Sequence, residues 1–164
     1  MRVAVAEKDP VASTQPSSHP SPPRQCDVIV AGGGPAGCTV AALLSLRGWS
    51  VTLFVKDWLP RFHIGESLLP MNLPILQRLG LLEEVERIGV RKAGPDFPAP
   101  TPDGYNVFRF QRALATTCPY AFQVRRDEFD KLLFDYAAAN GVHALQGHRV
   151  TSVDLKSTEV TAKI

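Results

Sequence analysis

The sequence predicts an α/β fold, and three observations support this prediction. Residues 27–31 (DVIVA) form a short apolar run that leads directly into a cluster of glycines. A helical pattern of small and aliphatic residues follows at 35–47, and a second apolar run follows at 50–55. A strand, a helix and a second buried strand in this order make a βαβ unit, in which the helix is buried against a parallel sheet.

The composition is that of a globular protein. The chain has 164 residues and is 45% hydrophobic, so it is long enough to form a core. Its formal net charge of +2 does not indicate nucleic-acid binding. No apolar run approaches the ~20 residues of a membrane span. None of the 3 cysteines stands in a C-x-x-C pair, which argues against a disulfide scaffold or a zinc site and suits a reducing, cytoplasmic location.

Residues 1–25 are predicted to be a disordered leader. Prolines and serines are interspersed throughout this stretch, and large apolar residues are almost absent. Such a composition buries too little surface to offset the entropy of ordering the chain. The stretch also lacks the apolar core of a secretory signal.

The glycine cluster at 32–37 (GGGPAG) fits the pattern G-x-G-x-x-G at Gly32, Gly34 and Gly37. The first glycine permits the tight turn, the second lets a pyrophosphate approach the backbone, and the third lets helix and strand pack closely. The free N–H groups and positive dipole end of the following helix point at the same place. The cluster predicts a dinucleotide site, and a structural turn without a ligand is the alternative.

The second strand, 50–55, ends without the acid that a dinucleotide site usually has. An Asp or Glu about 20 residues past the glycines binds the ribose hydroxyls, and Val55 stands at that place. A charged hydrogen bond lost from such a site costs roughly 1.5–3 kcal/mol. Asp57, in the following loop, is the candidate to replace it.

Residues 58–70 (WLPRFHIGESLLP) contain two prolines that bracket a loop. The loop carries four side chains of types that are common in catalytic and binding sites: Arg61, His63, Glu66 and Ser67. Taken alone, the stretch is equally well a solvated connection or a functional loop. The run 61–70, however, resembles the second signature of the FAD-dependent halogenases and related flavin monooxygenases. The similarity continues through 79–81 (LGL) and 120–133 (YAFQVRRDEFDKLL), and it covers about residues 26–155.

The resemblance implies a Rossmann-like, three-layer FAD-binding domain of the glutathione-reductase type, with FAD as its cofactor. Residues 26–164 would then be an incomplete FAD-binding domain, in which the start of an antiparallel substrate-domain sheet is inserted at about 90–125.

The resemblance also implies roles for individual residues. The glycine loop would hold the pyrophosphate, Arg61 would lie near the FAD phosphates or ribose, and the loop at 65–67 would approach the flavin ring. Arg126 would touch the cofactor from the start of its helix, and the family usually has Glu where this chain has Val55. The cofactor-binding candidates are Gly32, Gly33, Gly34, Pro35, Ala36, Gly37, Arg61, Glu66, Ser67 and Arg126.

Lys92, in the segment 92–97 (KAGPDF), resembles the active-site lysine of the halogenases. In that chemistry hypochlorous acid formed at the flavin meets the lysine, which positions or carries the electrophilic chlorine. Monooxygenase relatives have similar segments, and an ordinary surface lysine is the alternative. Lys92 is the candidate catalytic residue.

The middle of the chain predicts short helices followed by strands. Residues 71–90 give one or two helices that end at glycines, and the prolines between 95 and 102 prevent a helix beyond them. Asp103-Gly104 is a hairpin signal. The aromatic-rich run 105–110 is expected to form a strand, with 120–124 as its partner and the aromatic side chains in a core.

The last third returns to the parallel sheet. Residues 127–139 show apolar side chains at helical spacing, and 142–145 is expected to be a third parallel strand. A hairpin of 149–155 and 159–164 is expected to open an antiparallel meander. His148 is expected in a turn, exposed to solvent.

Two motifs of the resembled family are not in the sequence. It has no Gly-Asp dipeptide, which binds the ribityl chain in that family, and no Trp-x-Trp-x-Ile-Pro signature. We therefore expect the amino-terminal, FAD-binding portion of an oxidoreductase that uses reduced FAD and oxygen on a small organic substrate. Expected partners are a flavin reductase or a separately encoded remainder. The alternatives are a non-catalytic flavin- or nucleotide-binding remnant and an interaction module.

Overall fold

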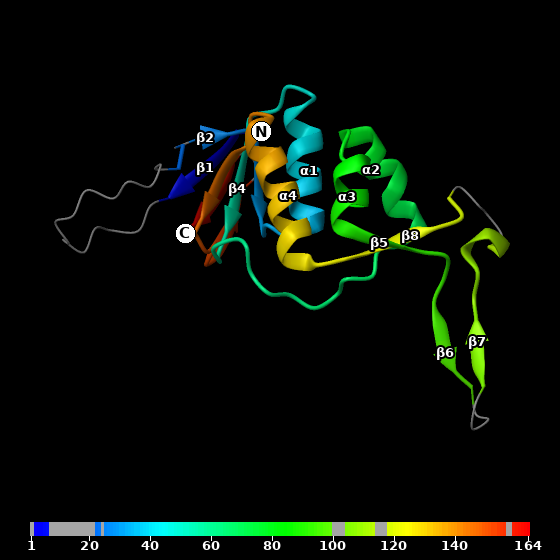
Figure 1. The fold of residues 1–164 in the computed structure, drawn as a ribbon. Coiled ribbons are helices and arrows are strands. Elements are labelled where there is room, and N and C mark those ends of the chain that lie inside the picture. The colour runs from blue at the N-terminus through cyan, green and yellow to red at the C-terminus, as the bar shows by residue number, and fades with distance from the viewer. Residues whose placement is uncertain (1, 7–21, 24, 100–103, 114–117, 157–158) are drawn as a thin grey trace. The chain divides into compact units, whose positions relative to one another are not determined.

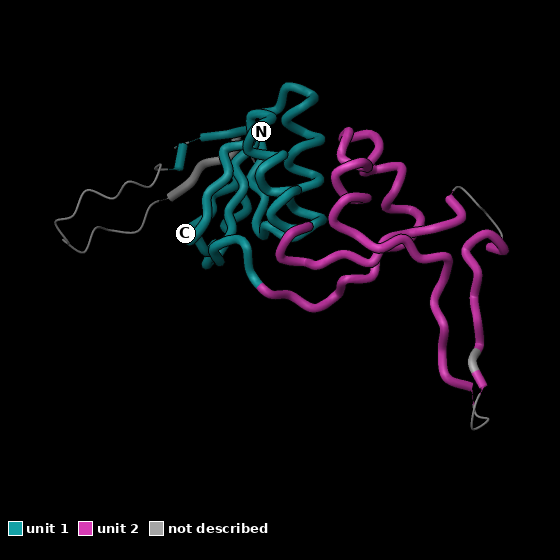
Figure 2. The backbone as a smooth tube through the Cα atoms, in the orientation of Figure 1, with its two compact units in different colours: residues 1–61, 130–164 teal, residues 62–129 magenta. Residues whose placement is uncertain are grey.

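The structure is a computed structural model that describes residues 2–6, 22–23, 25–99, 104–113, 118–156 and 159–164. Figure 1 shows its helices and strands along the chain. The chain divides into two compact units (Figure 2). Unit 1 comprises residues 1–61 and 130–164, and unit 2 comprises residues 62–129.

The centre of unit 1 is a parallel sheet of three strands in the order β3-β4-β9. The strands are β3 (Val28–Ala31), β4 (Val51–Val55) and β9 (His143–Gln146). Every residue of β4 is buried, which explains why its sequence is apolar without alternation. The predicted βαβ unit and the third parallel strand are confirmed.

Two helices accompany this sheet: α1 (Pro35–Ser45) and α4 (Arg126–Ala139). The buried face of α1 consists of Cys38, Ala41 and Ala42, whereas the side chain of Val40 is 44% exposed. The helix predicted at 35–47 is therefore buried on one face, because small side chains bring that face close to the sheet and leave larger ones such as Val40 outside. At the ends of the two helices, the Ser45 hydroxyl donates a hydrogen bond to the Asn140 carbonyl at 2.7 Å.

A second, mixed sheet in unit 1 has the order β10-β11-β1-β2. Its strands are β10 (Ser152–Leu155), β11 (Glu159–Lys163), β1 (Arg2–Ala6) and β2 (Gln25–Cys26). The predicted hairpin of β10 and β11 is confirmed. The leader differs from its prediction at residues 2–6, because β1 pairs in parallel with β11 and the backbone hydrogen bonds of that pairing order it. Residues 7–21 lie outside the described part of the chain.

The described part of unit 2 contains two short helices and two pairs of antiparallel strands. The helices are α2 (Leu73–Leu79) and α3 (Leu82–Ile88), which agree with the prediction, and two 3₁₀ turns lie at Pro70–Asn72 and Phe110–Arg112. The strand pairs are β5 (Gly89–Lys92) with β8 (Ala121–Val124), and β6 (Asp96–Pro98) with β7 (Tyr105–Val107).

The predicted pairing of 105–110 with 120–124 is wrong. Strand β7 pairs with β6 across the segment that carries the Asp103-Gly104 signal. This local hairpin is favoured over pairing with 120–124, because closing a short loop costs less conformational entropy than closing a long one. The expectation of a buried aromatic stripe is not met at Phe108, which is 58% exposed and contacts the 53% exposed Phe97 edge to face, with 5.7 Å between the ring centroids. None of the helices in the described part of the chain is long and apolar enough to span a membrane.

Candidate functional site

The glycine loop forms a sharp turn between β3 and α1. Gly32 adopts a left-handed φ of +116° and donates its N–H to the Phe54 carbonyl at 2.8 Å. Gly34 is the N-cap of α1, with extended backbone and no side-chain cap, and Pro35 occupies the first turn. Because no side chain caps α1, the free N–H groups of its first turn are available to an outside acceptor.

The glycines of the loop differ in the space around them. A Cβ at Gly37 would lie 1.9 Å from the Gly32 carbonyl oxygen, and a Cβ at Gly33 would lie 2.3 Å from the Val55 Cγ2. A Cβ at Gly34 would meet nothing within 4 Å. Gly33 and Gly37 therefore keep the loop against its neighbours, while Gly34 leaves open space where a ligand can approach the backbone.

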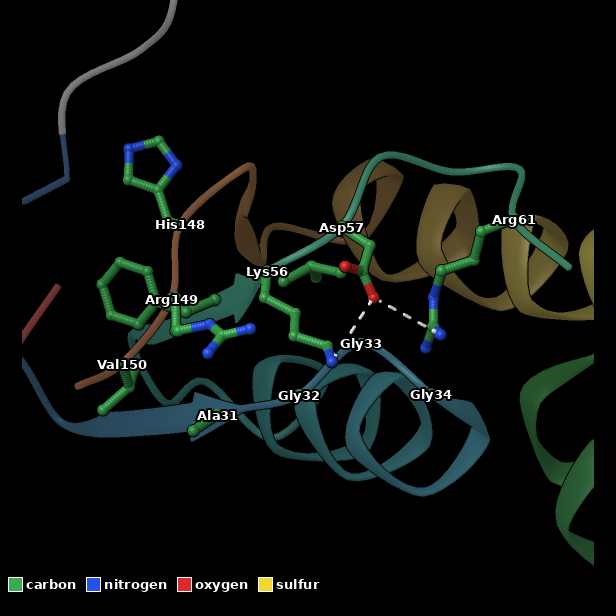
Figure 3. Close-up of a pocket in the computed structure, with 12 residues that line it drawn as sticks. Ala31, Gly32, Gly33, Gly34, Lys56, Asp57, Arg61, His148, Arg149 and Val150 are labelled. Atoms are coloured by element: carbon green, nitrogen blue, oxygen red, sulfur yellow. Dashed lines mark ion pairs between the residues drawn. The ribbon is translucent and has the colours of Figure 1, made fainter. Parts of the chain in front are cut away.

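A cavity of about 250 Å³ opens at the carboxyl end of the parallel sheet (Figure 3). Each strand contributes to its walls: the glycine loop follows β3, residues 55–57 end β4, and residues 148–150 follow β9. Ligands of open α/β sheets bind at this edge. His148 lines the cavity and is half-buried, so the expectation of a solvent-exposed turn histidine is wrong.

Cationic side chains predominate around this cavity. The Asp57 carboxylate lies 3.5 Å from the Arg61 guanidinium and 3.9 Å from the Lys56 ammonium. Arg149 also lines the cavity and forms no ion pair with any carboxylate among the described residues (Figure 3). The cavity therefore has three cationic side chains and one carboxylate.

The residues of this cavity fit a diphosphate. The Arg61 Nε is buried and has no hydrogen-bond partner within the described structure, although Arg61 lines the cavity. A buried N–H group without an acceptor lowers the stability of the folded chain, because its lost hydration is not replaced. The helix N-terminus, the space beside Gly34 and the cations Lys56 and Arg61 supply what a diphosphate oxygen needs.

The position expected for a ribose-binding acid is apolar in the structure as well as in the sequence. Val55 is 2% exposed and pairs with Gln146 of β9. The His148 N–H donates to the Val55 carbonyl at 3.0 Å, which holds the loop after β9 against the end of β4. Asp57 does line the cavity, but its carboxylate is engaged by two cations.

Sequence reasoning identified the glycine loop and Arg61, and it missed Lys56 and Arg149 as residues of this cavity. Both follow the carboxyl ends of predicted parallel strands, and that position was the available signal.

Unit 2 has a cavity of its own, which residues 62–67 and Gln123 line. The loop is held to β8 by backbone hydrogen bonds, since the Val124 N–H donates to the Glu66 carbonyl at 2.9 Å and the Leu68 N–H to the Phe122 carbonyl at 2.9 Å. The Glu66 carboxylate accepts a longer hydrogen bond of 3.4 Å from the Gln123 amide.

Lys92 lies beside the same loop. Its ammonium donates a hydrogen bond to the Ser67 hydroxyl. Partial burial lowers the pKa of Lys92 below its ordinary value of 10.5, because the charged form is less well solvated. The structure thus brings Lys92 and Ser67 together from distant parts of the sequence.

Arg126 fixes the backbone of the loop. Its Nη1 donates to the carbonyl oxygens of Ile64 and Gly65 at 3.1 and 3.3 Å. Gly65 has a left-handed φ of +102°, and a Cβ there would lie 3.2 Å from the same nitrogen. Arg126 therefore supports the residues that precede Glu66 and Ser67.

Among the residues that the structure describes, the other reactive side chains do not form a second kind of site. Burial raises the pKa of the Cys38 thiol to about 12, which makes it a poor nucleophile. Across the described ranges, no three His, Cys, Asp or Glu side chains gather as ligands of a metal ion.

Comparison with known proteins places the chain among flavoproteins. The sequence model of the family described as FAD binding domain matches residues 25–164. The flavin-dependent halogenase armH3 of Armillaria mellea is 34% identical over 156 residues, which are 87% of this chain and 28% of that protein. The tryptophan 2-halogenase of Chondromyces crocatus is 39% identical over 133 residues, which are 80% of this chain and 24% of that protein.

The chain is also similar to solved structures of flavin-dependent halogenases. The myxobacterial chondrochloren halogenase CndH superimposes with a TM-score of 0.73 at 35% identity, covering 80% of this chain and 31% of that one. The flavin-dependent halogenase CmlS superimposes with a TM-score of 0.71 at 37% identity, covering 79% and 24%. The chain spans about a quarter to a third of the length of these relatives.

Proposed function

This chain belongs to the FAD-binding domain family of the flavin-dependent halogenases and monooxygenases, and from that premise we propose that its unit 1 cavity binds the adenosine diphosphate part of FAD. The observation that carries this proposal is the loop itself, in which Gly33 and Gly37 are closed by packing and Gly34 is open. A diphosphate over Gly34 would meet the free N–H groups of α1, and the Arg61 guanidinium lines the same cavity.

Bound FAD, once reduced, supplies the electrons that activate oxygen. Lys56 and Arg61 neutralise phosphate charge, and the buried strands behind the loop hold the N–H groups in place before the ligand arrives. Such preorganisation strengthens binding because little ordering remains to be done. We propose a flavin reductase as the partner that provides reduced flavin, and the cytoplasm as the location.

Within unit 2, we propose that Lys92 is the residue that positions an oxidised halogen. The Ser67 hydroxyl accepts a hydrogen bond from its ammonium and thereby fixes the direction of the side chain. A lysine held in this way can donate a proton to the oxygen of a hypohalous acid and keep the halogen in one place. In the same unit, Glu66 and Ser67 are held by β8 and Arg126, as the loop nearest the flavin ring would need to be.

The substrate that we propose is an electron-rich aromatic ring, either free or attached to a carrier protein. The names of the relatives support this class. One is a tryptophan 2-halogenase, and another, from Pseudomonas fluorescens, is a 1H-pyrrole-2-carbonyl-[peptidyl-carrier protein] chlorinase with 30% identity over 148 residues. An electrophilic halogen attacks such rings without further activation.

The binding part of the proposal is tested by titrating the chain with FAD and following flavin fluorescence. The Gly34→Ala variant should bind FAD at least roughly ten-fold more weakly, because the new methyl group occupies the approach to the backbone, which corresponds to about 1.4 kcal/mol. Its urea midpoint should be unchanged, since the methyl group meets no protein atom within 4 Å. Arg47→Ala, which removes a charge beyond the other end of α1, is the matched control. A wild-type chain that does not bind FAD overturns the proposal.

The catalytic part is tested with chemically reduced FAD, oxygen and bromide or chloride, using tryptophan and pyrrole-2-carboxylate as probes. Halogenated product should form with the wild-type chain and be lost in Lys92→Met, while the FAD affinity of this variant stays the same. Hydroxylated product that is independent of both halide and Lys92 would contradict the role of Lys92 and favour a monooxygenase.

A further inference from the structure

We propose that the ribose end of the unit 1 cavity binds a phosphate, so that the chain prefers 2′-phosphorylated adenine nucleotides to their unphosphorylated counterparts. The inference concerns a ligand class beyond FAD. It rests on the proposed function only in that both ligands would share the glycine loop.

The strand order locates the ribose. In a sheet of this kind the diphosphate lies at the loop after the first strand, and the end of the second strand faces the ribose 2′-hydroxyl. Here the second strand is β4, which lies between β3 and β9. The ribose position is therefore the end of β4, with the glycine loop on one side and the segment after β9 on the other.

The side chain at that position cannot bind a hydroxyl. Val55 is apolar and buried, and it packs where a Cβ at Gly33 would otherwise lie. An acid here would accept hydrogen bonds from an unmodified ribose and would repel a phosphate. Val55 does neither, which removes the usual discrimination against a phosphorylated ribose.

Cations replace the acid on both sides of this position. Lys56 follows Val55 directly in the chain, and Arg149 lies in the segment that the His148 N–H fastens to the Val55 carbonyl. Figure 3 shows the Lys56 and Arg149 side chains among those that line the cavity. An arginine near the end of the second strand is the usual means of accommodating a ribose 2′-phosphate.

Arg149 is the residue best placed for this role. The carboxylate of the cavity, Asp57, is already shared between Arg61 and Lys56, whereas Arg149 pairs with no described carboxylate. Arg149 follows β9, on the side of β4 away from the glycine loop. A diphosphate at the glycine loop therefore leaves Arg149 available for a second phosphate, to which its guanidinium can bind through two parallel N–H groups.

The test compares two ligands that differ only in the 2′-phosphate, adenosine 5′-monophosphate and adenosine 2′,5′-bisphosphate, by isothermal titration calorimetry at low salt. The bisphosphate should bind roughly ten-fold more tightly or better, the range that a charge-assisted hydrogen bond supplies. Adenosine 3′,5′-bisphosphate measures the effect of charge without the 2′ position and should bind more weakly than its 2′,5′ isomer.

Three variants sharpen the test. Arg149→Ala should reduce the preference for the 2′-phosphate to about two-fold or less while leaving the affinity for the monophosphate the same, whereas Arg47→Ala should retain the full preference. Val55→Glu should reverse it, because a carboxylate accepts from the ribose hydroxyls and repels the phosphate. Arg149 and Arg47 are exposed, so these two substitutions do not endanger folding.

Equal affinity for the two matched ligands, a preference that survives Arg149→Ala, or equal binding of the 2′,5′ and 3′,5′ isomers would each overturn the inference. A separate titration with FAD distinguishes this failure from that of the proposed function. If the chain binds FAD but shows no preference for the 2′-phosphate, only this inference is overturned. If it shows the preference but does not bind FAD, only the proposed function is overturned.

Discussion

The two units carry cavities that are built in different ways. In unit 1 the walls are strand ends and a glycine turn, supported from behind by a strand whose five residues are all buried. In unit 2 the walls are the side chains of a loop that is hydrogen-bonded to a short strand, and Lys92 and Arg126 complete the arrangement. The comparison shows that the unit 1 cavity is formed by backbone at the ends of buried strands, whereas the unit 2 cavity is formed by a loop that is hydrogen-bonded to the mostly buried strand β8.

The largest expected difference between the units comes from removing one aromatic ring from each. Phe54 is 1% exposed in β4 and Phe97 is 53% exposed in β6. Phe54→Ala should lower the free energy of unfolding by about 3–5 kcal/mol, because it leaves a cavity in the core. Phe97→Ala should cost about 1 kcal/mol, mainly through its edge-to-face contact with Phe108. Urea unfolding followed by circular dichroism measures both, and similar losses would show that Phe97 is packed as closely as Phe54.

A smaller difference is expected from two glycine substitutions that create similar overlaps. A Cβ at Gly37 would lie 1.9 Å from the Gly32 carbonyl oxygen, and a Cβ at Gly94 would lie 1.7 Å from the Phe108 carbonyl oxygen. Gly37→Ala should cost about 3 kcal/mol, because α1 and β3 cannot separate without disturbing the sheet. Gly94→Ala should cost about 1 kcal/mol, since the β6–β7 pair, whose β6 is exposed throughout, can shift.

Amide hydrogen exchange distinguishes these two outcomes by location. Protection should fall throughout unit 1 in Gly37→Ala and only near β6 and β7 in Gly94→Ala. If Gly94→Ala destabilised the whole chain, the assignment of β6 and β7 to a locally independent hairpin would be wrong.

The smallest expected effect concerns thiol reactivity and leaves stability untouched. Cys38 in unit 1 is fully buried and its pKa is raised to about 12, while Cys118 in unit 2 is partly exposed. A thiol reagent reacts with the thiolate, so at pH 8 Cys118 should react first and Cys38 only on unfolding. Titration of the native chain and of its Cys118→Ser variant, with mass-spectrometric mapping, measures the order. Rapid labelling of Cys38 in the native chain would contradict the close packing of α1.

The contrast between the units also explains how far the sequence alone could be interpreted. The β-branched run, the glycine spacing and the apolar second strand predicted β3, α1, β4 and β9 and their parallel order, because each signal is local and strong. Arg61 was identified by resemblance, and the structure brings it to the same cavity as the glycine loop.

The features that were missed depend on long-range pairing. Residues 89–92 (GVRK) carry little strand signal of their own, so nothing local indicated that β8 would pair with them rather than with β7. Lys56 and Arg149 are ordinary surface cations in the sequence, and only the neighbouring positions of β4 and β9 make them parts of one cavity. The leader was misjudged at Arg2–Ala6 because a strand at a sheet edge is stabilised by backbone pairing, which composition does not reveal.

That edge strand has a practical consequence. Strand β11 is hydrogen-bonded to β10 on one side and to β1 on the other, with Arg2 opposite Glu159 and Ala6 opposite Lys163. Trimming the first six residues to remove an apparently dispensable tail would expose a row of unpaired N–H and C=O groups along β11. Such a row recruits strands from other molecules, so a shortened chain is expected to precipitate or oligomerise during purification even though the unit 1 cavity is intact.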